Sequence, residues 1–453
     1  MKGKFIDDTL YVIPDNQNRT IIYDVDSNMI SYSESSMDEF MKIEDLSAFH
    51  DKKMERVIPE KVKRNIDYVI VGVAETCNLR CTYCYADGGT YGKNPQKVMS
   101  FNELKEMLFQ LLEVTPTGIK YFSFFGGEPL LGFRAIKEFV EFASEYLPQH
   151  NLPIPRWGIV TNGTLITDEV VEFFNKHNFS VNVSLDGPKE INDQTRIFAN
   201  SKESVYDVVE KNLRRINNPT FILSCQSTLN KDFFINYKKG SYSNYIEKMY
   251  ALGYDYVSPL IAQCSETAVL EKNLAIKIKE YYEDMVEFDF KLLMSGENLK
   301  LVSAYTLSII DRLTKQEYHL GCHMGSESIY YSAQGKFYSC HLMYGLGERE
   351  ITKEELISEK TVKYIDKMEN EECRSCLARN ICFSWCPGSD RLLKGKHDES
   401  SCFAQKVSVE LVILKLVHIM ENENRFSVFS KNYKIAAGTS AKAKGVMNHE
   451  KIL

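Results

Sequence analysis

The sequence predicts an α/β fold with a parallel sheet, preceded by a small β-rich segment and followed by a cysteine-rich region. Apolar runs of strand length alternate with amphipathic helical segments through the middle of the chain, which is typical of parallel sheets. Polar, strand-forming sequence comes before this alternation. Seven cysteines gather in the C-terminal third of the 453 residues, which indicates a separate unit there.

The N-terminal segment, residues 1–64, is expected to be rich in strands. Two strands are predicted at 5–13 and 20–25, on either side of the turn signal at 14–16. A short helix is expected over 37–49. This segment is predicted to form a small domain of its own.

Six strand–helix units are expected within residues 65–298. The strands are predicted at 68–74, 119–125, 157–160, 180–185, 221–229 and 255–261. The helices are predicted at 101–112, 136–143, 168–177, 204–216, 235–252 and 273–293. Ser100 and Glu103 form a capping-box signature before the first helix. Six such units give a parallel sheet covered by helices, either as a barrel or as a doubly wound sheet.

The remaining chain is predicted to contain three parts. Residues 299–319 are expected to form a linker helix, 320–405 a cysteine-rich domain, and 406–453 a C-terminal helix with a flexible tail. The tail after residue 424 is rich in small residues and lysine, so we expect poor order there. The apolar run 411–420 is too short to cross a bilayer.

Composition excludes several classes of function. The net charge of −7 gives no electrostatic basis for binding nucleic acid. The first ten residues lack the apolar core of a signal peptide, and no segment predicts a membrane span, so a cytoplasmic protein is expected. Twelve cysteines in a reducing compartment favour metal ligation over disulfides.

Three cysteines, Cys77, Cys81 and Cys84, form a Cys-x3-Cys-x2-Cys cluster directly after the first strand of the alternation. A closed zinc or iron–sulfur site normally takes four protein ligands, and no histidine lies nearby in sequence. Three thiolates leave one metal position open for a reactant. The alternative interpretations are a zinc site and three buried thiols.

The cluster, with Tyr83 just before its third cysteine, resembles the signature of the radical S-adenosylmethionine (radical SAM) enzymes. The resemblance implies that Cys77, Cys81 and Cys84 hold a [4Fe–4S] cluster whose open iron is chelated by S-adenosylmethionine (SAM). It implies reductive cleavage of SAM to a 5′-deoxyadenosyl radical. It also implies a partial (β/α)6 TIM-like barrel with the cysteine loop at the C-terminal end of the first strand, where barrel enzymes place their chemistry.

Further motifs follow the next predicted strands. Gly126-Gly127-Glu128 ends the second strand, Asn162 follows the third, Ser184 ends the fourth, and Arg196 lies shortly after. In the family that the chain resembles, Tyr83 and these residues bind the cofactor. The glycine motif contacts the amino group of SAM, the asparagine lies near the nucleoside, and the serine and arginine hold the carboxylate. Turn residues and a surface ion pair are the alternative interpretations.

The second cysteine group resembles the SPASM domain, which carries auxiliary clusters in many peptide-modifying radical SAM enzymes. Its spacing is Cys322-x12-Gly335-x4-Cys340, then Cys-x2-Cys-x5-Cys-x3-Cys, then a last cysteine. The resemblance implies two auxiliary [4Fe–4S] clusters and three clusters in all. The distal cluster would be held by Cys373, Cys376, Cys382 and Cys402, and the proximal cluster by Cys322, Cys340 and Cys386. A zinc ribbon is the alternative.

Seven thiolates leave the proximal cluster with one ligand too few. We therefore hypothesise an open iron or a non-cysteine ligand there, with His319, His323 and His341 as candidates. Cys225 and Cys264 are expected to be small core residues. Cys264 is also a candidate to face the mouth of the active site.

The resemblance implies a peptide maturase of the sactipeptide or ranthipeptide type, which installs a crosslink, a cysteine thioether, in a ribosomally synthesised precursor. Its partners would be a small cysteine-containing precursor peptide and a flavodoxin or ferredoxin electron donor. Residues 1–64 resemble a shortened leader-recognition domain that binds a peptide at a sheet edge. Alternatives are a formylglycine-forming sulfatase-type maturase, a carbon–carbon or carbon–oxygen crosslinking maturase, and a non-catalytic metal scaffold.

Overall fold

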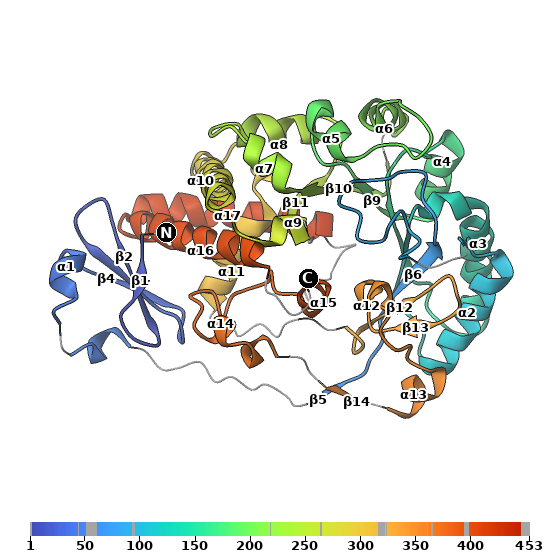
Figure 1. Cartoon of the computed structure of the whole chain (residues 1–453), viewed down its shortest axis with the longest axis horizontal. Coiled ribbons are helices and arrows are strands. Elements are labelled where there is room, and N and C mark those ends of the chain that lie inside the picture. The colour runs from blue at the N-terminus through green and yellow to red at the C-terminus, as the bar shows by residue number, and fades with distance from the viewer. Residues whose placement is uncertain are drawn as a thin grey trace.

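The computed structural model describes residues 2–43, 45–50, 61–92, 96–217, 219–262, 265–315, 322, 324–359, 361–363, 366–393 and 398–444. A large mixed sheet occupies the centre of the molecule, and a small antiparallel sheet from the N-terminus lies at one end, beside helix α16 (Glu399–Met420). Helices α2 (Phe101–Val114) and α3 (Phe133–Gln149) lie at the opposite end (Figure 1).

Six parallel strands in chain order make up most of the central sheet. They are β6 (Tyr68–Ala74), β7 (Tyr121–Gly126), β8 (Arg156–Thr161), β9 (Ser180–Ser184), β10 (Ile222–Leu229) and β11 (Tyr256–Ile261). Each pairs in parallel with its predecessor, and β11 forms one edge of the sheet. The predicted α/β fold with a partial barrel is confirmed, and all six predicted strands are present.

The other edge of this sheet comes from the cysteine-rich region. Strand β12 (Ser328–Tyr331) pairs in parallel with β6, with Ser328 opposite Tyr68, and β13 (Phe337–Tyr338) pairs antiparallel with β12. Because β6 leads into the cysteine loop, the C-terminal region pairs directly with the strand that precedes the first three cysteines. The sequence pattern did not predict this pairing.

Helices connect the strands on the outside. Besides α2 and α3 they are α4 (Asp168–Lys176), α5 (Lys189–Thr195), α6 (Val205–Leu213), α7 (Lys231–Asn236), α8 (Tyr242–Tyr250), α9 (Ser265–Ala268) and α10 (Lys272–Ser295), with the 3-10 turn η2 (Pro129–Gly132). Helix α2 begins with the predicted capping box, since Ser100 N–H donates to Glu103 at 2.8 Å and Glu103 N–H donates back to Ser100 Oγ at 3.4 Å. The single helix predicted over 235–252 is wrong, because the chain turns between α7 and α8 and Gly240 adopts a φ of +86°.

An aromatic core fixes the strands whose ends carry the site. Trp157 of β8 stacks on Phe122 and Phe124 of β7, with ring centroids 5.6 and 6.2 Å apart, and Phe139 of α3 packs edge-on against it. All four side chains are buried. Large buried aromatic surfaces of this kind dominate core energetics, so β7 and β8 are held rigidly.

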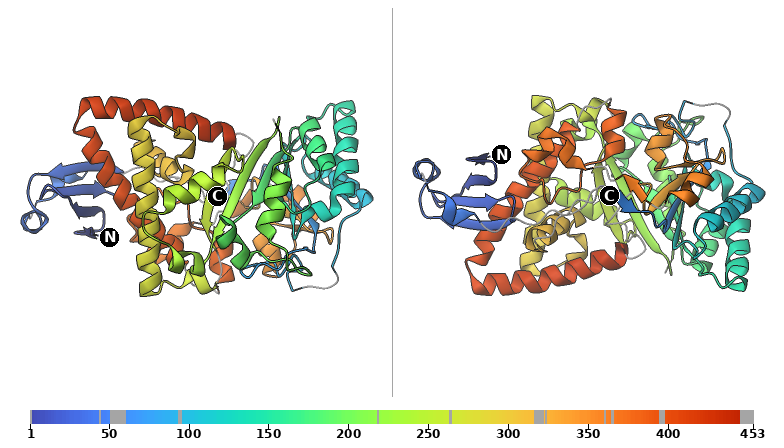
Figure 2. Two further views of the ribbon diagram at one scale, coloured as in Figure 1. Left: turned by 90° about the horizontal axis from the view of Figure 1, so that it is seen from above. Right: turned by 90° about the horizontal axis from the view of Figure 1, so that it is seen from below.

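The N-terminal segment is a four-stranded antiparallel meander of β1 (Lys4–Phe5), β2 (Leu10–Pro14), β3 (Thr20–Asp24) and β4 (Met29–Ser33). Strand β4 was not predicted. The predicted helix over 37–49 is replaced by two short turns, α1 (Met37–Phe40) and η1 (Ser47–Phe49). Both views of Figure 2 show this sheet projecting from one end of the molecule.

The C-terminal region is largely helical and irregular. Its elements are η3 (Leu299–Leu301), α11 (Ala304–Lys315), α12 (His341–Gly345), α13 (Lys353–Ser358), η4 (Lys367–Glu369), α14 (Glu371–Arg374), α15 (Pro387–Leu392), α16 and α17 (Glu423–Lys444), with β14 (Thr361–Lys363) paired to β5 (Lys61–Lys63). No helix within the described ranges has the length and apolar content needed to cross a membrane.

The prediction of a poorly ordered tail after residue 424 is wrong as far as Lys444. Helix α17 packs beside α10 (Figure 2). Phe429 stacks on Phe290 with centroids 5.7 Å apart, and Asn432 Nδ2 donates to the carbonyl oxygen of Leu293 at 2.8 Å. Composition alone suggested a flexible tail, but three buried side chains on one face, Phe429, Asn432 and Ala436, hold the helix in place.

Candidate functional site

The cysteine loop begins where β6 ends, and its three thiols are partly buried. The backbone N–H of Leu79 donates to Cys77 Sγ at 3.3 Å, and the N–H of Gly88 donates to Cys84 Sγ at 3.4 Å. Burial raises the pKa of Cys77 to about 12 and that of Cys81 to about 11. Burial thus disfavours the thiolate forms of Cys77 and Cys81, and a bound metal would favour them.

The three residues fit a cluster ligand set. Nearby thiols contribute to the raised pKa values of Cys77 and Cys81 after burial, so the sulfurs lie within electrostatic reach of one another. Backbone N–H groups already point at two of the sulfurs, as hydrogen bonds to cluster thiolates require. The described residues place no three such side chains around a single metal ion. A [4Fe–4S] cluster does not need three side chains around one metal ion, because each of its cysteines ligates a different iron atom.

The paired glycines bring the end of β7 against the start of the cysteine loop. Gly127 N–H donates to Ala74 O at 2.7 Å, and Glu128 N–H donates to Thr76 O at 2.9 Å. A Cβ atom on Gly127 would lie 2.2 Å from Thr76 O, and Gly126 has a φ of +135°. Side chains at these positions would push the loop away, so the glycines set its distance from β7.

Glu128 joins the ends of β7 and β8. Its carboxylate is fully buried and accepts hydrogen bonds from Leu130 N–H at 2.9 Å, Thr161 Oγ1 at 2.8 Å and Asn162 N–H at 2.7 Å. Burial raises its pKa to about 7, although these donors favour the charged form. The side chain thus holds the turn that presents Asn162.

Asn162 in turn connects β8 to the cysteine loop. Its Nδ2 donates to Asn78 Oδ1 at 2.8 Å and approaches Cys77 Sγ at 3.7 Å, while its Oδ1 accepts from Thr164 Oγ1 at 2.6 Å. Asn78 Nδ2 also donates to Thr164 Oγ1 at 2.8 Å. These amides fix the orientation of the loop beside its first cysteine.

Arg196 reaches the second cysteine from the far side of the loop. Its Nε forms a buried ion pair with Asp186 Oδ1 at 3.0 Å, and its Nη1 lies 4.0 Å from Cys81 Sγ. Tyr83 donates its hydroxyl to Asp186 Oδ2 at 2.5 Å, and the guanidinium lies over the Tyr83 ring at 5.7 Å. Ser184 is the last residue of β9 and is partly buried. The surface ion pair considered for Arg196 is wrong, because both partners are buried.

Sequence reasoning assigned no role to Asp186, Asn78 or Thr164, which the structure places at the centre of these networks. Asp186 follows a predicted strand end within Ser184-Leu185-Asp186-Gly187, and this position was its one visible signal. Asn78 and Thr164 are 86 residues apart, so no local pattern relates them.

The four cysteines assigned to the distal group line one cavity. Cys373, Cys376, Cys382 and Cys402 share it with Lys367, Glu372, Ala378, Arg379, Trp385, Gln405 and Lys406. Lys367 is buried, and its Nζ donates to the carbonyl oxygen of Cys382 at 3.2 Å. Four thiols in one cavity with nearby cations are the donor chemistry of an iron–sulfur cluster held by four cysteines.

The three remaining cysteines lie together near the barrel. Burial, followed by the neighbouring Cys386 and Cys340, raises the pKa of Cys322 to about 12. Cys340 and Cys386 precede α12 and α15. The ring of His341 packs against Phe125 at the end of β7, with centroids 5.0 Å apart.

The other candidates divide between the core and the undescribed ranges. Cys225 lies in the core and donates to the carbonyl oxygen of Leu185 at 3.4 Å. His319, His323 and Cys264 fall outside the described residues.

Comparison with known proteins identifies the class of domain. Residues 71–225 match the family model of the radical SAM superfamily, and this part of the chain is a radical SAM domain. The family implies a [4Fe–4S] cluster and SAM. The seven cysteines of the C-terminal third fit a SPASM domain.

The relatives make the comparison more specific. Over 196 residues the chain is 31% identical to a cysteine-type anaerobic sulfatase-maturating enzyme of Clostridium novyi (strain NT), a match that covers 41% of this chain and 47% of the relative. The chain thus spans about half the length of that relative. Native anSMEcpe with bound AdoMet has a similar structure, with a TM-score of 0.63 at 19% identity over 78% of this chain and 99% of that one. SuiB of Streptococcus suis bound to S-adenosylmethionine has a TM-score of 0.50 at 15% identity, over 74% and 75% of the two chains.

Proposed function

We propose that this protein is a radical SAM maturase that modifies a side chain of a peptide or protein substrate. The observation that carries the proposal is the convergence on a loop of three thiols of Glu128 and Asn162, which follow the ends of β7 and β8, and of Arg196, which follows α5. A [4Fe–4S] cluster with SAM would supply a 5′-deoxyadenosyl radical for abstraction of a hydrogen atom from the substrate.

The chain's own residues bind, orient and exclude water around this chemistry. Cys77, Cys81 and Cys84 would hold the cluster. The backbone at Gly126-Gly127-Glu128, together with Tyr83, Asn162, Ser184 and Arg196, would hold SAM. Asp186 keeps the Arg196 guanidinium charged and in place beside Cys81. The buried Glu128 fixes the turn before Asn162.

The C-terminal cysteines would hold two auxiliary clusters, Cys373, Cys376, Cys382 and Cys402 the distal one, and Cys322, Cys340 and Cys386 the proximal one. Oxidative modification of a peptide leaves an electron, and these clusters would carry it away from the substrate. An external flavodoxin or ferredoxin would be the electron donor for SAM cleavage. Cys373, Cys376, Cys382 and Cys402 line one cavity, which supports their assignment to one cluster.

For the product, we propose a cysteine thioether in a small precursor peptide, with the N-terminal sheet as the leader-binding element. The four-stranded antiparallel meander supports the leader-binding role, because its outer strands β1 and β4 each pair on one side within the described residues. A formylglycine residue in a sulfatase is the second candidate. The sequence similarity to a cysteine-type sulfatase-maturating enzyme favours it.

The experiment has two stages. The first measures 5′-deoxyadenosine from anaerobically reconstituted protein with SAM and a strong reductant, beside the Cys77/Cys81/Cys84→Ala variant. Product that disappears in the variant supports the radical enzyme, and its absence from iron-loaded protein would overturn the proposal. The second stage measures the mass of cysteine-containing peptides after incubation. A thioether removes two hydrogen atoms, whereas conversion of cysteine to formylglycine replaces the sulfur by oxygen and also removes two hydrogen atoms.

A further inference from the structure

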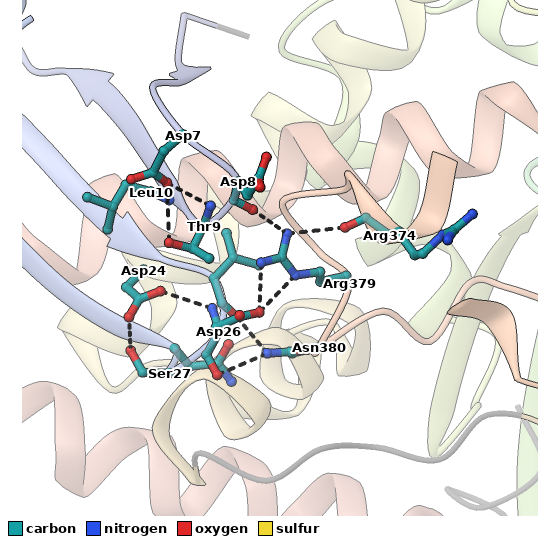
Figure 3. Close-up of polar contacts among 12 residues, drawn as sticks. Asp7, Asp8, Thr9, Leu10, Asp24, Asp26, Ser27, Arg374, Arg379 and Asn380 are labelled. Carbon is teal, nitrogen blue, oxygen red and sulfur yellow. Dashed lines mark hydrogen bonds and ion pairs between the residues drawn. The ribbon is translucent and has the colours of Figure 1, made fainter. Parts of the chain in front are cut away.

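The N-terminal sheet is fastened to the four-cysteine cavity by a buried guanidinium. Arg379 lies midway between Cys376 and Cys382 and is 5% exposed. Its Nε and Nη2 both donate to Oδ1 of Asp26, at 3.1 and 2.7 Å (Figure 3). Asp26 lies in the turn between β3 and β4. The two residues are 353 positions apart in the chain. This ion pair is therefore a tertiary connection between the two ends of the protein.

The same guanidinium also holds the cysteine segment itself. Arg379 Nη1 donates to the carbonyl oxygen of Arg374, next to Cys373, at 3.2 Å and to that of Asp8 at 2.9 Å (Figure 3). The turn between Cys376 and Cys382 is closed by Cys382 N–H donating to Ala378 O at 2.7 Å. One side chain thus connects the backbone beside Cys373 to the turn that carries two further cysteines.

Neighbouring contacts support the same interface. Asn380 Nδ2 donates to Val25 O at 2.6 Å, and Tyr11 Oη donates to Glu410 Oε2 at 2.8 Å, on the helix that begins just before Cys402. Burial, then Glu410 and also Cys376, raises the pKa of Tyr11, which places this strand within electrostatic reach of the cavity. The sheet therefore contacts segments that carry all four cysteines.

We propose that Arg379 is a positioning residue for the four-cysteine cluster, and that the N-terminal sheet, through Asp26, is part of the structure that holds this cluster. The inference rests on the auxiliary cluster included in the proposed function. A buried guanidinium needs a charged partner, and Asp26 supplies it. Without the docked sheet, Arg379 would lose its counter-ion and the spacing of the cysteines would relax.

The test counts iron and sulfide in the full-length chain carrying Cys77/Cys81/Cys84→Ala, so that auxiliary clusters alone contribute. Two [4Fe–4S] clusters give about eight iron atoms per chain. We expect Arg379→Ala to retain about half of this iron. We expect Asp26→Asn to release iron to a chelator severalfold faster than the triple-alanine background does. We expect the iron content of Arg379→Lys to lie between that of the background and that of Arg379→Ala. The matched control is Arg374→Ala, which removes an exposed side chain but keeps the carbonyl that Arg379 uses.

Circular dichroism identifies any variant that fails to fold, and Asp26→Asn then decides the question. This inference would be overturned, and the proposed function left standing, by two results together. A folded Arg379→Ala variant would retain its full iron content, and Asp26→Asn would release iron to the chelator at the rate of the triple-alanine background. Equal loss in Arg374→Ala would also overturn it, because the effect would not be specific to the buried pair. No iron in the triple-alanine background would overturn the auxiliary-cluster assignment, and this inference with it.

Discussion

Asp186 gathers four donors beside the cysteine loop, so replacing it with asparagine tests the electrostatics of the site. Its carboxylate accepts hydrogen bonds from Tyr83 Oη at 2.5 Å, Thr195 Oγ1 at 3.0 Å and Thr228 N–H at 3.0 Å. It also forms the 3.0 Å ion pair with Arg196. Asparagine keeps the shape but removes the charge and turns an NH2 group toward donors.

The expected magnitude follows from burial. The Asp186 and Arg196 side chains are 2% and 8% exposed, so removal of one charge leaves the other in a low-dielectric environment. Breaking a buried pair in this way typically costs about 3–5 kcal/mol. We therefore expect Asp186→Asn to lower the free energy of unfolding by about that amount, and to reduce 5′-deoxyadenosine formation because Arg196 shifts beside Cys81.

The measurement uses denaturant unfolding of reduced, metal-free protein, so that cluster loss does not contribute. The chain has two tryptophans, and a Trp385→Phe background leaves Trp157 as the reporter of the barrel core. The matched control is Asp67→Asn. Asp67 pairs with Lys120 at 2.6 Å on the surface, where a pair contributes about 0–1 kcal/mol.

The reasoning would be refuted if Asp186→Asn and Asp67→Asn lowered stability equally. A double-mutant cycle with Arg196→Gln provides a second criterion. If the cost comes from an unpaired Arg196, the double variant will be more stable than the sum of the two single effects predicts, by about 1–3 kcal/mol.

Three other predictions concern the glycine motif, the buried glutamate and the last helix. Gly127→Ala places a methyl group 2.2 Å from the backbone oxygen of Thr76, so it should lower the free energy of unfolding by about 1–3 kcal/mol and slow SAM cleavage. The control Gly438→Ala lies in open space on a helix and should stabilise the protein by up to about 1 kcal/mol. Equal effects of the two variants in denaturant unfolding would contradict the packing argument. Because the pKa of Glu128 is raised to about 7, the folded metal-free chain retains a proton that the unfolded chain releases between pH 4.5 and 7. The free energy of unfolding of the wild type should therefore fall relative to that of Glu128→Gln as pH rises through this window, by about 3 kcal/mol at most. A difference between the two proteins that does not change with pH would contradict this prediction. Phe429→Ala should cost about 3–5 kcal/mol and make α17 sensitive to trypsin in limited proteolysis, and unchanged cleavage would show that the helix is held by other contacts.

Local pattern was sufficient where local physics determines the structure. The apolar run of β6 predicted its strand with the same bounds, since a buried parallel strand needs a continuous apolar sequence. Ser100 and Glu103 predicted the start of α2, because a capping box involves residues three positions apart. The cysteine spacings likewise predict two metal-binding regions, and this stays a prediction.

Pattern failed where the determining contact is distant. Asp26 and Arg379 have no sequence relation, yet they form a buried ion pair at 2.7 Å between the N-terminal sheet and the cysteine-rich region. The small residues after 424 suggested disorder because composition does not show that Asn432 meets the end of α10. Asp186 had no role in the sequence pattern, because its partners in β10 and in the loop of Tyr83 are distant in the chain.

The pairing of β12 with β6 also affects how the protein is made. Ser328 lies opposite Tyr68, so β6 leaves the ribosome 260 residues ahead of its neighbour (68 to 328). At translation speeds of about 5–20 residues per second that interval lasts about 10–50 s. During this time the open edge of β6 borders the first cysteine loop, and unpaired edges favour association with other chains. This edge of β6 is therefore unprotected by its native neighbour until β12 has been synthesised.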